Sequence, residues 1–328
     1  MKTMNTKPSL EIKSDINFLK KALSLFHEQY DSNLVYRQFC DHLKIKKADV
    51  KTIKDIPFLP IEFFKTHEVK KGKFSPQVTF LSSGTTGQKQ SKHHVRDLSI
   101  YIDSFTKTFT EFYGPVEDYV ILGLLPSYLE REGSSLIYMV DHFIKKSEFS
   151  ESGFYLDDLE QLSKTLKKLD QSGHKILLIG VSFALLDLIE KESFELRNTI
   201  IMETGGMKGR RKEMIREELH KILAKGFGVN RIHSEYGMTE LLSQAYSKGH
   251  SRFECPSHMK ILIRDTEDPL TYLEHGKTGG INVIDLANVD SCPFIATQDL
   301  GKQINSKEFE ILGRFDQSDI RGCNLLVL

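Results

Sequence analysis

The chain has 328 residues, of which 39% are hydrophobic and 27% are charged; this composition is ordinary for a folded protein and excludes disorder as its main feature. Lys and Arg together number 45, as do Asp and Glu, so the chain lacks the basic excess typical of nucleic-acid-binding proteins and no nucleic-acid partner is expected. No apolar run approaches the ~20 residues of a membrane helix, and the first residues lack the apolar core of a signal peptide, so no membrane span is expected.

Residues 1–75 are predicted to form a helical N-terminal segment packed on the core. Four apolar residues recur at intervals of 4, 3 and 4, which places them on one helix face: Leu19, Leu23, Phe26 and Tyr30. Residues 34–43 repeat this pattern before prolines at 57 and 60 interrupt it. No chemistry is assigned to this segment.

From residue 76 onward, strands alternate with helices. Continuous apolar runs at 120–125 and 176–179 are typical of strands buried on both faces. Helices are predicted at 183–190 and 212–223, and strands at 199–202 and 231–234. This alternation predicts an α/β core over residues 76–255 with a largely parallel sheet. After Lys260 the strands look shorter and are separated by turns such as Gly279-Gly280, so residues 256–328 are predicted to form a small β-rich subdomain.

A loop rich in Gly, Ser and Thr directly follows the apolar run 78–81, and its residues are Ser82, Ser83, Gly84, Thr85, Thr86 and Gly87. Its glycines allow a ligand to approach backbone N–H groups, and its hydroxyls can donate hydrogen bonds to phosphate oxygens. It is not a Walker A loop, which has four residues between its glycines. A flexible turn is the alternative interpretation. His93 and His94 follow, and because strand neighbours point to opposite sides, at most one of them faces a site.

Four further segments carry polar residues or glycines at the ends of predicted strands. They are Thr204-Gly205-Gly206, Tyr236-Gly237-Met238-Thr239-Glu240, Ala296-Thr297-Gln298-Asp299-Leu300-Gly301 and Leu312-Gly313-Arg314-Phe315-Asp316. The first two follow neighbouring strands, where open α/β sheets place their ligand crevice. A ring, a hydroxyl and a carboxylate from the second segment would then face one site.

Together and in this order, the five segments resemble the core motifs of the adenylate-forming superfamily, which includes acyl-CoA synthetases, peptide-synthetase adenylation domains and luciferases. The resemblance spans residues 78–323. It implies the superfamily's N-terminal-domain fold, with α/β layers around a parallel sheet and a small β-rich subdomain, and it implies ATP-dependent activation of a carboxylic acid as acyl-AMP. Only six residues follow Gly322, so the superfamily's mobile C-terminal domain is expected to be absent.

The resemblance also implies a role for each motif residue. Ser82 to Gly87 would close over the departing phosphates, and Gly205 and Gly206 would contact adenine. Tyr236 would stack on adenine beside Gly237, Thr239 would contact the α-phosphate, and Glu240 would hold Mg²⁺. Asp299 would accept both ribose hydroxyls and Arg314 would support the ribose. ATP and Mg²⁺ are thus the expected cofactors, with Thr239 and Glu240 catalytic.

Each of these residues also has a purely structural interpretation. Tyr236 could be a core aromatic with a satisfied hydroxyl, Glu240 an exposed carboxylate at a helix start, and Asp299 a turn residue. Two departures from the superfamily matter as well. Lys89-Gln90-Ser91 replaces the usual Pro-Lys-Gly after the loop, and the C-terminal-domain lysine is expected to be missing. Either another basic residue substitutes, or the protein adenylates slowly or not at all.

Within the superfamily, three segments resemble the acyl-protein synthetases of bacterial bioluminescence: residues 60–65, 125–131 and 321–323. Those proteins activate a fatty acid, move the acyl group to a cysteine near their own C-terminus, and hand it to a reductase. The resemblance implies this acceptor role for Cys323 and a fatty acid, an acyl reductase or a carrier protein as partners. The alternatives are an AMP-forming acid–CoA ligase or a non-catalytic protein that binds nucleotide or acyl-AMP.

Cys323 itself has two interpretations, an exposed nucleophile or a small hydrophobe in the terminal apolar run. The other three cysteines, Cys40, Cys255 and Cys292, are expected to be structural. All four lie far apart in the sequence with no CxxC pair, which predicts a reduced, cytoplasmic protein.

Overall fold

The computed structural model describes residues 10–83, 89–125, 133–156, 158–205 and 214–315. Its α-helices are α1 (Asp15–Ser32), α2 (Leu34–His42), α3 (Phe63–Thr66), α4 (Leu98–Tyr113), α5 (Ser135–Lys146), α6 (Leu159–Gln171), α7 (Ser182–Lys191) and α8 (Arg216–Phe227). Short 3-10 turns lie at Lys47–Asp49 and Val116–Asp118. None of the described helices is both long and apolar enough to cross a membrane.

Twelve of the described strands form one mixed sheet. Its parallel half consists of β5 (Gly153–Phe154), β4 (Val120–Leu124), β6 (Ile176–Gly180), β7 (Thr199–Glu203) and β8 (His233–Tyr236), in that spatial order. It continues antiparallel through β9 (Ala245–Ser247), β10 (Arg252–Glu254), β14 (Glu308–Arg314), β13 (Phe294–Gln303), β12 (Thr278–Asp285) and β11 (Met259–Arg264). β1 (Leu59–Pro60) pairs with β13, and β2 (Val78–Leu81) and β3 (Lys92–Val95) form a separate antiparallel pair.

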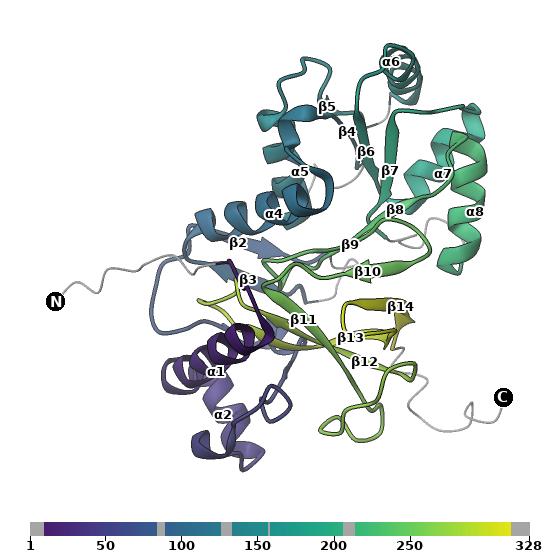
Figure 1. Ribbon diagram of the computed structural model, residues 1–328. Coiled ribbons are helices and arrows are strands. Elements are labelled where there is room, and N and C mark those ends of the chain that lie inside the picture. Colours follow the sequence, from purple (N-terminus) through teal and green to yellow (C-terminus); the bar gives the residue numbers. More distant parts are fainter. Residues whose placement is uncertain (1–9, 84–88, 126–132, 157, 206–213, 316–328) are drawn as a thin grey trace.

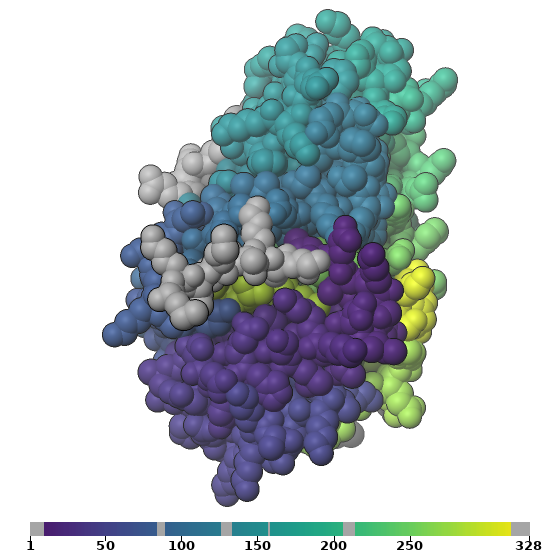
Figure 2. All heavy atoms as spheres, turned by 60° about the vertical axis from the view of Figure 1, so that its left-hand side comes forward, coloured from purple at the N-terminus to yellow at the C-terminus, as the bar shows by residue number. Residues whose placement is uncertain are grey.

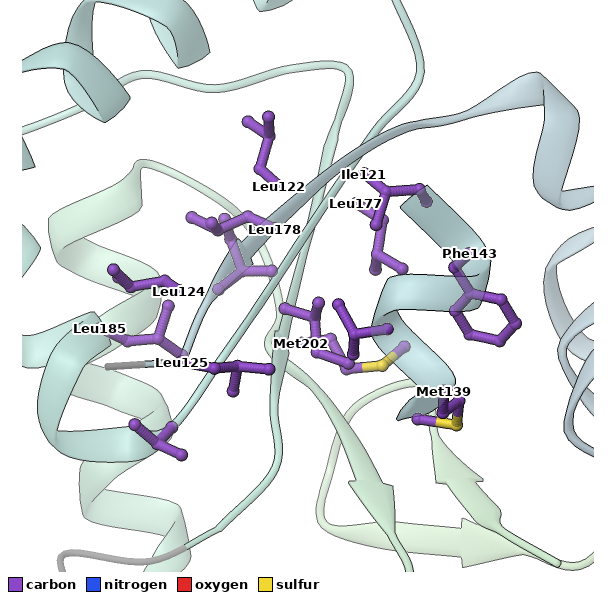
Figure 3. Close-up of a cluster of buried hydrophobic side chains, with 14 of the residues drawn as sticks. Ile121, Leu122, Leu124, Leu125, Met139, Phe143, Leu177, Leu178, Leu185 and Met202 are labelled. Atoms are coloured by element: carbon purple, nitrogen blue, oxygen red, sulfur yellow. The ribbon is translucent and has the colours of Figure 1, made fainter. Parts of the chain in front are cut away.

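In the parallel half, strands alternate with helices along the chain, as the sequence predicts. β4 and β6 are buried along their whole length because helices lie on both sides of them, α4 and α5 on one side and α7 and α8 on the other (Figure 1). Figure 3 shows the apolar cluster that results, in which Leu122 and Leu178 of the sheet lie with Leu185 of α7, while Met139 and Phe143 come from α5. The predicted α/β class is confirmed, although β8 begins two residues later than expected.

The antiparallel half differs from the sequence prediction in strand length. The strands after Lys260 are not shorter: β12 has 8 residues and β13 has 10, against 5 in β4. Gly279 and Gly280 lie inside β12, where a Cβ on Gly279 would approach the carbonyl oxygen of Arg264 to 2.2 Å. These glycines therefore permit close packing within the ladder instead of ending the strand.

The N-terminal helices pack against the antiparallel strands, with which they share the second apolar cluster. Helix α1 is present as predicted, but its buried face is rotated from the expected one: Leu19, Leu23 and Tyr30 are only partly buried, and the buried residues are Phe18, Ala22, Leu25, Phe26 and Gln29. The side-chain amide of Gln29 donates to the carbonyl of Val289 at 2.8 Å, so a polar contact helps to set the rotation. Figure 2 shows this purple segment in the lower half of the molecule, with the blue and teal α/β layers above it. The division at residues 75 and 255 stays a prediction.

Candidate active site

Three residues from separate sequence motifs meet where β8, β13 and β14 come together. The Tyr236 hydroxyl donates to Asp299 Oδ2 at 2.8 Å, and Arg314 Nε donates to Asp299 Oδ1 at 3.1 Å. The β13–β14 register pairs Asp299 with Arg314 directly. Burial and the charge of Asp299 raise the pKa of Tyr236, so its phenol keeps the proton that it donates. The structure therefore brings together the predicted nucleotide-site residues of three motifs.

Two of the structural alternatives can be decided at this cluster. Asp299 is not a turn residue, because it lies within β13 with 6% of its surface exposed. Tyr236 matches its structural alternative, a core aromatic with a satisfied hydroxyl: its ring meets Phe253 and Phe309 edge-on, at centroid distances of 6.1 and 6.0 Å. Stacking of Tyr236 on adenine stays a prediction.

Thr239 and Glu240 lie in the turn after β8, outside any helix. Glu240 is 5% exposed, so the alternative of an exposed helix-start carboxylate is wrong. Burial raises the pKa of Glu240, while a hydrogen bond from Ser91 and the charges of Arg314 and Lys65 act against that rise. Thr239 is half-buried. This turn is thus close to two cations, and one of them, Lys65, comes from the N-terminal segment to which the sequence assigns no chemistry.

Only the base of the Ser/Gly-rich loop is described. The Ser91 N–H donates to Ser82 Oγ at 2.9 Å, and the Gln90 side chain donates to the Ser82 carbonyl at 2.8 Å. Ser83 follows Ser82 without a regular element. The remaining loop residues, Gly84, Thr85, Thr86 and Gly87, lie outside the described residues. The same holds for Gly206 and Cys323.

The backbone at Gly205 is held by a buried glutamate, Glu203, to which the sequence assigns no role. Glu203 Oε2 accepts from the Gly205 N–H at 2.6 Å, and Gly205 has a φ of +77°, which favours glycine. Glu203 Oε1 accepts from the Ser234 hydroxyl at 2.8 Å and lies 3.4 Å from both Arg216 Nε and His220 Nε2. Burial alone would raise the pKa of Glu203, but these partners outweigh burial and lower it to about 2.

A second buried glutamate lies on the neighbouring strand, directly before Tyr236. Burial and the nearby charge of Glu203 raise the pKa of Glu235 to about 8, and no hydrogen bond to its carboxyl is found among the described residues. A Cβ on Gly237 would lie 2.5 Å from Glu235 Oε1, so a side chain at 237 would collide with this carboxyl. A side chain at 237 would therefore require the Glu235 carboxyl to move.

Two more polar residues bind the backbone at Glu240 and in the residues directly after it. Asp285 accepts from the N–H groups of Leu242 and Ser243 at 2.7 and 3.0 Å, and Asn288 donates to the Glu240 carbonyl at 2.8 Å. A sequence signal existed for Asp285 and Glu203, since each is an acidic residue at the end of an apolar strand. No local signal marks the partners that they bind.

The residues present fit a magnesium–nucleotide complex. Mg²⁺ is commonly held by one or two carboxylates together with substrate phosphates, and Glu240 supplies one carboxylate at this position. Within the described ranges, no group of three or more His, Cys, Asp or Glu residues could hold a metal ion by itself. A site of this kind would therefore depend on the nucleotide for its remaining ligands.

Among solved structures, the fold is similar to those of adenylate-forming CoA ligases. 2-Hydroxyisobutyryl-CoA ligase in complex with 2-HIB-AMP and CoA matches with a TM-score of 0.70 and 12% identity, over 95% of this chain and 73% of that chain. ATP-bound MatB from Rhodopseudomonas palustris matches with a TM-score of 0.54 and 16% identity, over 74% of this chain and 49% of that chain. At these identities the likeness shows the fold alone, and it confirms the predicted adenylate-forming architecture.

The sequence assigns the chain more narrowly. The family model of the acyl-protein synthetase LuxE matches residues 6–328, so the chain belongs to the LuxE family of acyl-protein synthetases. A search of curated protein sequences gives no match. The predicted branch of the superfamily is thereby confirmed.

Proposed function

We propose that this protein activates a carboxylic acid, most simply a fatty acid, as acyl-AMP and transfers the acyl group to a protein thiol. One observation carries the proposal: Tyr236, Asp299 and Arg314 form one hydrogen-bonded cluster, and the charge of Arg314 also acts on Glu240. Membership of the LuxE family, whose model is described as acyl-protein synthetase, supports the choice of acceptor.

In the first step, a carboxylate oxygen of the acid attacks the α-phosphorus of ATP, and the bond to pyrophosphate breaks. Negative charge builds on phosphate oxygens, so the site must present hydrogen-bond donors and cations to them. We assign the Thr239 hydroxyl to the α-phosphate and the hydroxyls of the Ser82–Gly87 loop to the departing phosphates. Lys65 and Arg314 add positive charge beside Glu240. Bound Mg²⁺, for which Glu240 is the proposed ligand, would neutralise part of this charge.

Ribose recognition is assigned to Asp299. Its two oxygens already accept one hydrogen bond each, from Tyr236 and Arg314, which fixes the orientation of the carboxylate. An ionised carboxylate offers about four acceptor positions, so two remain for the ribose hydroxyls. The turn at Gly205 and Gly206 is assigned to adenine.

In the second step, a thiolate attacks the acyl carbonyl, the mixed anhydride breaks and AMP leaves. Cys323 is the proposed nucleophile. Burial raises the pKa of each described cysteine, to about 12 for Cys40 and further for Cys255 and Cys292. Because the thiolate is the reactive form, these three are unsuited to the step. An acyl reductase or a carrier protein would then receive the acyl group.

The activation step is tested by ATP–pyrophosphate exchange with a series of fatty acids and by the melting temperature in ATP with Mg²⁺ or in AMP. A ligand that binds only the folded state raises the melting temperature. Asp299→Ala should remove most of the rise, whereas the exposed Glu267→Ala should keep it. A rise without exchange for any acid would identify a non-catalytic binder, and no rise at millimolar nucleotide would refute the proposal.

The transfer step is tested by intact-protein mass spectrometry after incubation with ATP, Mg²⁺ and a fatty acid. The wild type should gain one acyl mass that neutral hydroxylamine releases, as expected for a thioester. Cys323→Ser should exchange pyrophosphate but carry no labile acyl group, while Cys255→Ser should behave as the wild type. Acyl-CoA formed on addition of CoA, with no acylated protein, would identify an acid–CoA ligase.

A further inference from the structure

The strand that leaves the Ser/Gly-rich loop has one buried face. Ser91 and His93 are each 1% exposed, whereas Lys92 between them is exposed and His94 is half-buried. Ser91 directly precedes β3 and burial alternates from Ser91 through His93, so Ser91 and His93 lie on the same buried side. The prediction that at most one of the two histidines faces the site is thus met, with His93 pointing inward and His94 contacting Thr79.

Both residues of this buried face contact the turn that holds Thr239 and Glu240. His93 Nδ1 lies 2.8 Å from the carbonyl oxygen of Thr239. Ser91 forms a hydrogen bond that lowers the pKa of Glu240, and its own N–H donates to Ser82 Oγ at 2.9 Å. One short stretch of chain therefore links the base of the loop to two neighbouring residues of the turn.

Asn288 extends this connection. His93 Nε2 lies 3.0 Å from Asn288 Oδ1, and Asn288 Nδ2 donates to the carbonyls of Glu240 and Cys292 at 2.8 and 3.0 Å. The two carbonyls fix the orientation of the amide, because the opposite orientation would place Oδ1 against them. The buried His93–Asn288 pair thus contacts the backbone carbonyls of both Thr239 and Glu240.

The polar character of His93 has an energetic cost. Both ring nitrogens face oxygen acceptors, yet burial lowers the pKa of His93 to about 4, so at neutral pH the ring has one N–H for two oxygens. Phe64 packs edge-on against the ring at 5.9 Å, and an apolar residue would suit this contact without that cost. A role in holding the turn explains the presence of histidine here.

We propose that Ser91 and His93 are positioning residues that connect Ser82, directly after β2, to Thr239 and Glu240 and so orient the hydroxyl and the carboxylate used in adenylation. This inference rests on the proposed function. Residues that hold a metal ligand or its neighbours by hydrogen bonds typically change activity or metal affinity by about 10- to 100-fold when they are replaced.

The test compares four variants: His93→Leu, His93→Gln, Ser91→Ala and the control His94→Leu. His93→Leu should lower kcat in pyrophosphate exchange by about 10-fold or more, with a much smaller change in KM for ATP, and should raise the Mg²⁺ concentration needed for half-maximal rate. His93→Gln keeps a donor and should recover part of the rate. Ser91→Ala should lower kcat in the same way, and His94→Leu should match the wild type.

A second readout needs no turnover. In the wild type, Mg²⁺ should add to the melting-temperature rise given by ATP; in His93→Leu that increment should shrink while the rise given by AMP persists. If the wild type exchanges pyrophosphate but His93→Leu and Ser91→Ala equal His94→Leu, the coupling is refuted and the proposed function stands. If AMP binding falls together with kcat and His93→Gln restores neither, His93 serves the fold alone. If the wild type neither binds nucleotide nor exchanges, both proposals fail.

Discussion

Two glutamates near the ends of adjacent strands have opposite pKa shifts because they point to opposite faces of the sheet. Glu203 on β7 and Glu235 on β8 are both buried. Glu203 points to the side of α7 and α8, where Ser182, Ser234, Arg216 and His220 surround it. Its pKa falls to about 2, whereas the pKa of Glu235 rises to about 8.

Glu235 points to the opposite face. The β8–β9 register places it beside Tyr246, and its charge would act on Tyr246 and on Tyr101 of α4. Among the described residues, neither the buried Tyr246 hydroxyl nor the Glu235 carboxyl has a hydrogen-bond partner, so Glu235 lacks donors of the kind that Glu203 has. Burial is shared by both glutamates, and the partners on each face therefore decide their charge.

The largest effect is expected from Glu203→Leu. The substitution leaves Arg216, His220 and the Gly205 N–H without their acceptor, and breaking a buried charge network by removing one partner costs about 3–5 kcal/mol in the free energy of unfolding. Urea unfolding measures this loss, with the exposed Glu195→Leu as control. A loss no greater than that of the control would show that the network does not stabilise the fold.

The next effect concerns Glu235 and alkaline pH. A folded-state pKa of about 8 lies above the ordinary 4.5, so the unfolded state releases its proton first and stability falls as pH rises from 4.5 to 8. Glu235→Gln removes this dependence. At pH 8 the variant should be more stable than the wild type by on the order of 4 kcal/mol, with the difference fading toward pH 4.5. Parallel stability–pH curves for the two proteins would contradict the assignment.

A smaller effect is expected from Ser234→Ala, which removes one donor to Glu203. Hydrogen bonds to charged groups contribute roughly 1.5–3 kcal/mol. The pKa of Glu203 is below its ordinary value, so its stabilising contribution is present above pH 4.5 and is lost as pH falls toward 2. Ser234→Ala should raise that pKa and move the midpoint of acid unfolding to higher pH. Circular dichroism during an acid titration measures this midpoint. An unchanged midpoint would count against the network.

The smallest effect is expected from Tyr246→Phe on the face of Glu235. Its hydroxyl has no hydrogen-bond partner in the described part of the chain, so removal should change stability by less than about 1 kcal/mol and in the stabilising direction. Thermal unfolding of Tyr246→Phe and of Ser234→Ala, measured under the same conditions, compares the loss of a hydroxyl on each face of the sheet. A loss as large as that of Ser234→Ala would mean that the hydroxyl has a partner in solution.

The sequence by itself determined the architecture of the parallel half and the order of the site motifs. The apolar runs of β4 and β6 predict burial on both faces, because a strand covered by helices on both sides has no polar side. The five motifs also indicated the family before any geometry was known. Each buried strand and each motif is a short stretch of neighbouring residues, so its residue types can be recognised in the sequence without knowledge of the fold.

Only the tertiary structure decided which polar groups meet. Glu203 and Glu235 look alike in sequence, and their opposite charge states depend on donors from α7, α8 and β8 that reach only one of them. Glycines read as turns at 279 and 280 proved to lie inside β12, because close approach of a neighbouring strand is invisible in local sequence. The contacts of Glu240 and His93 likewise join residues up to 195 positions apart. A hydrogen bond needs donor and acceptor within about 3 Å, and only folding brings such distant residues to that distance.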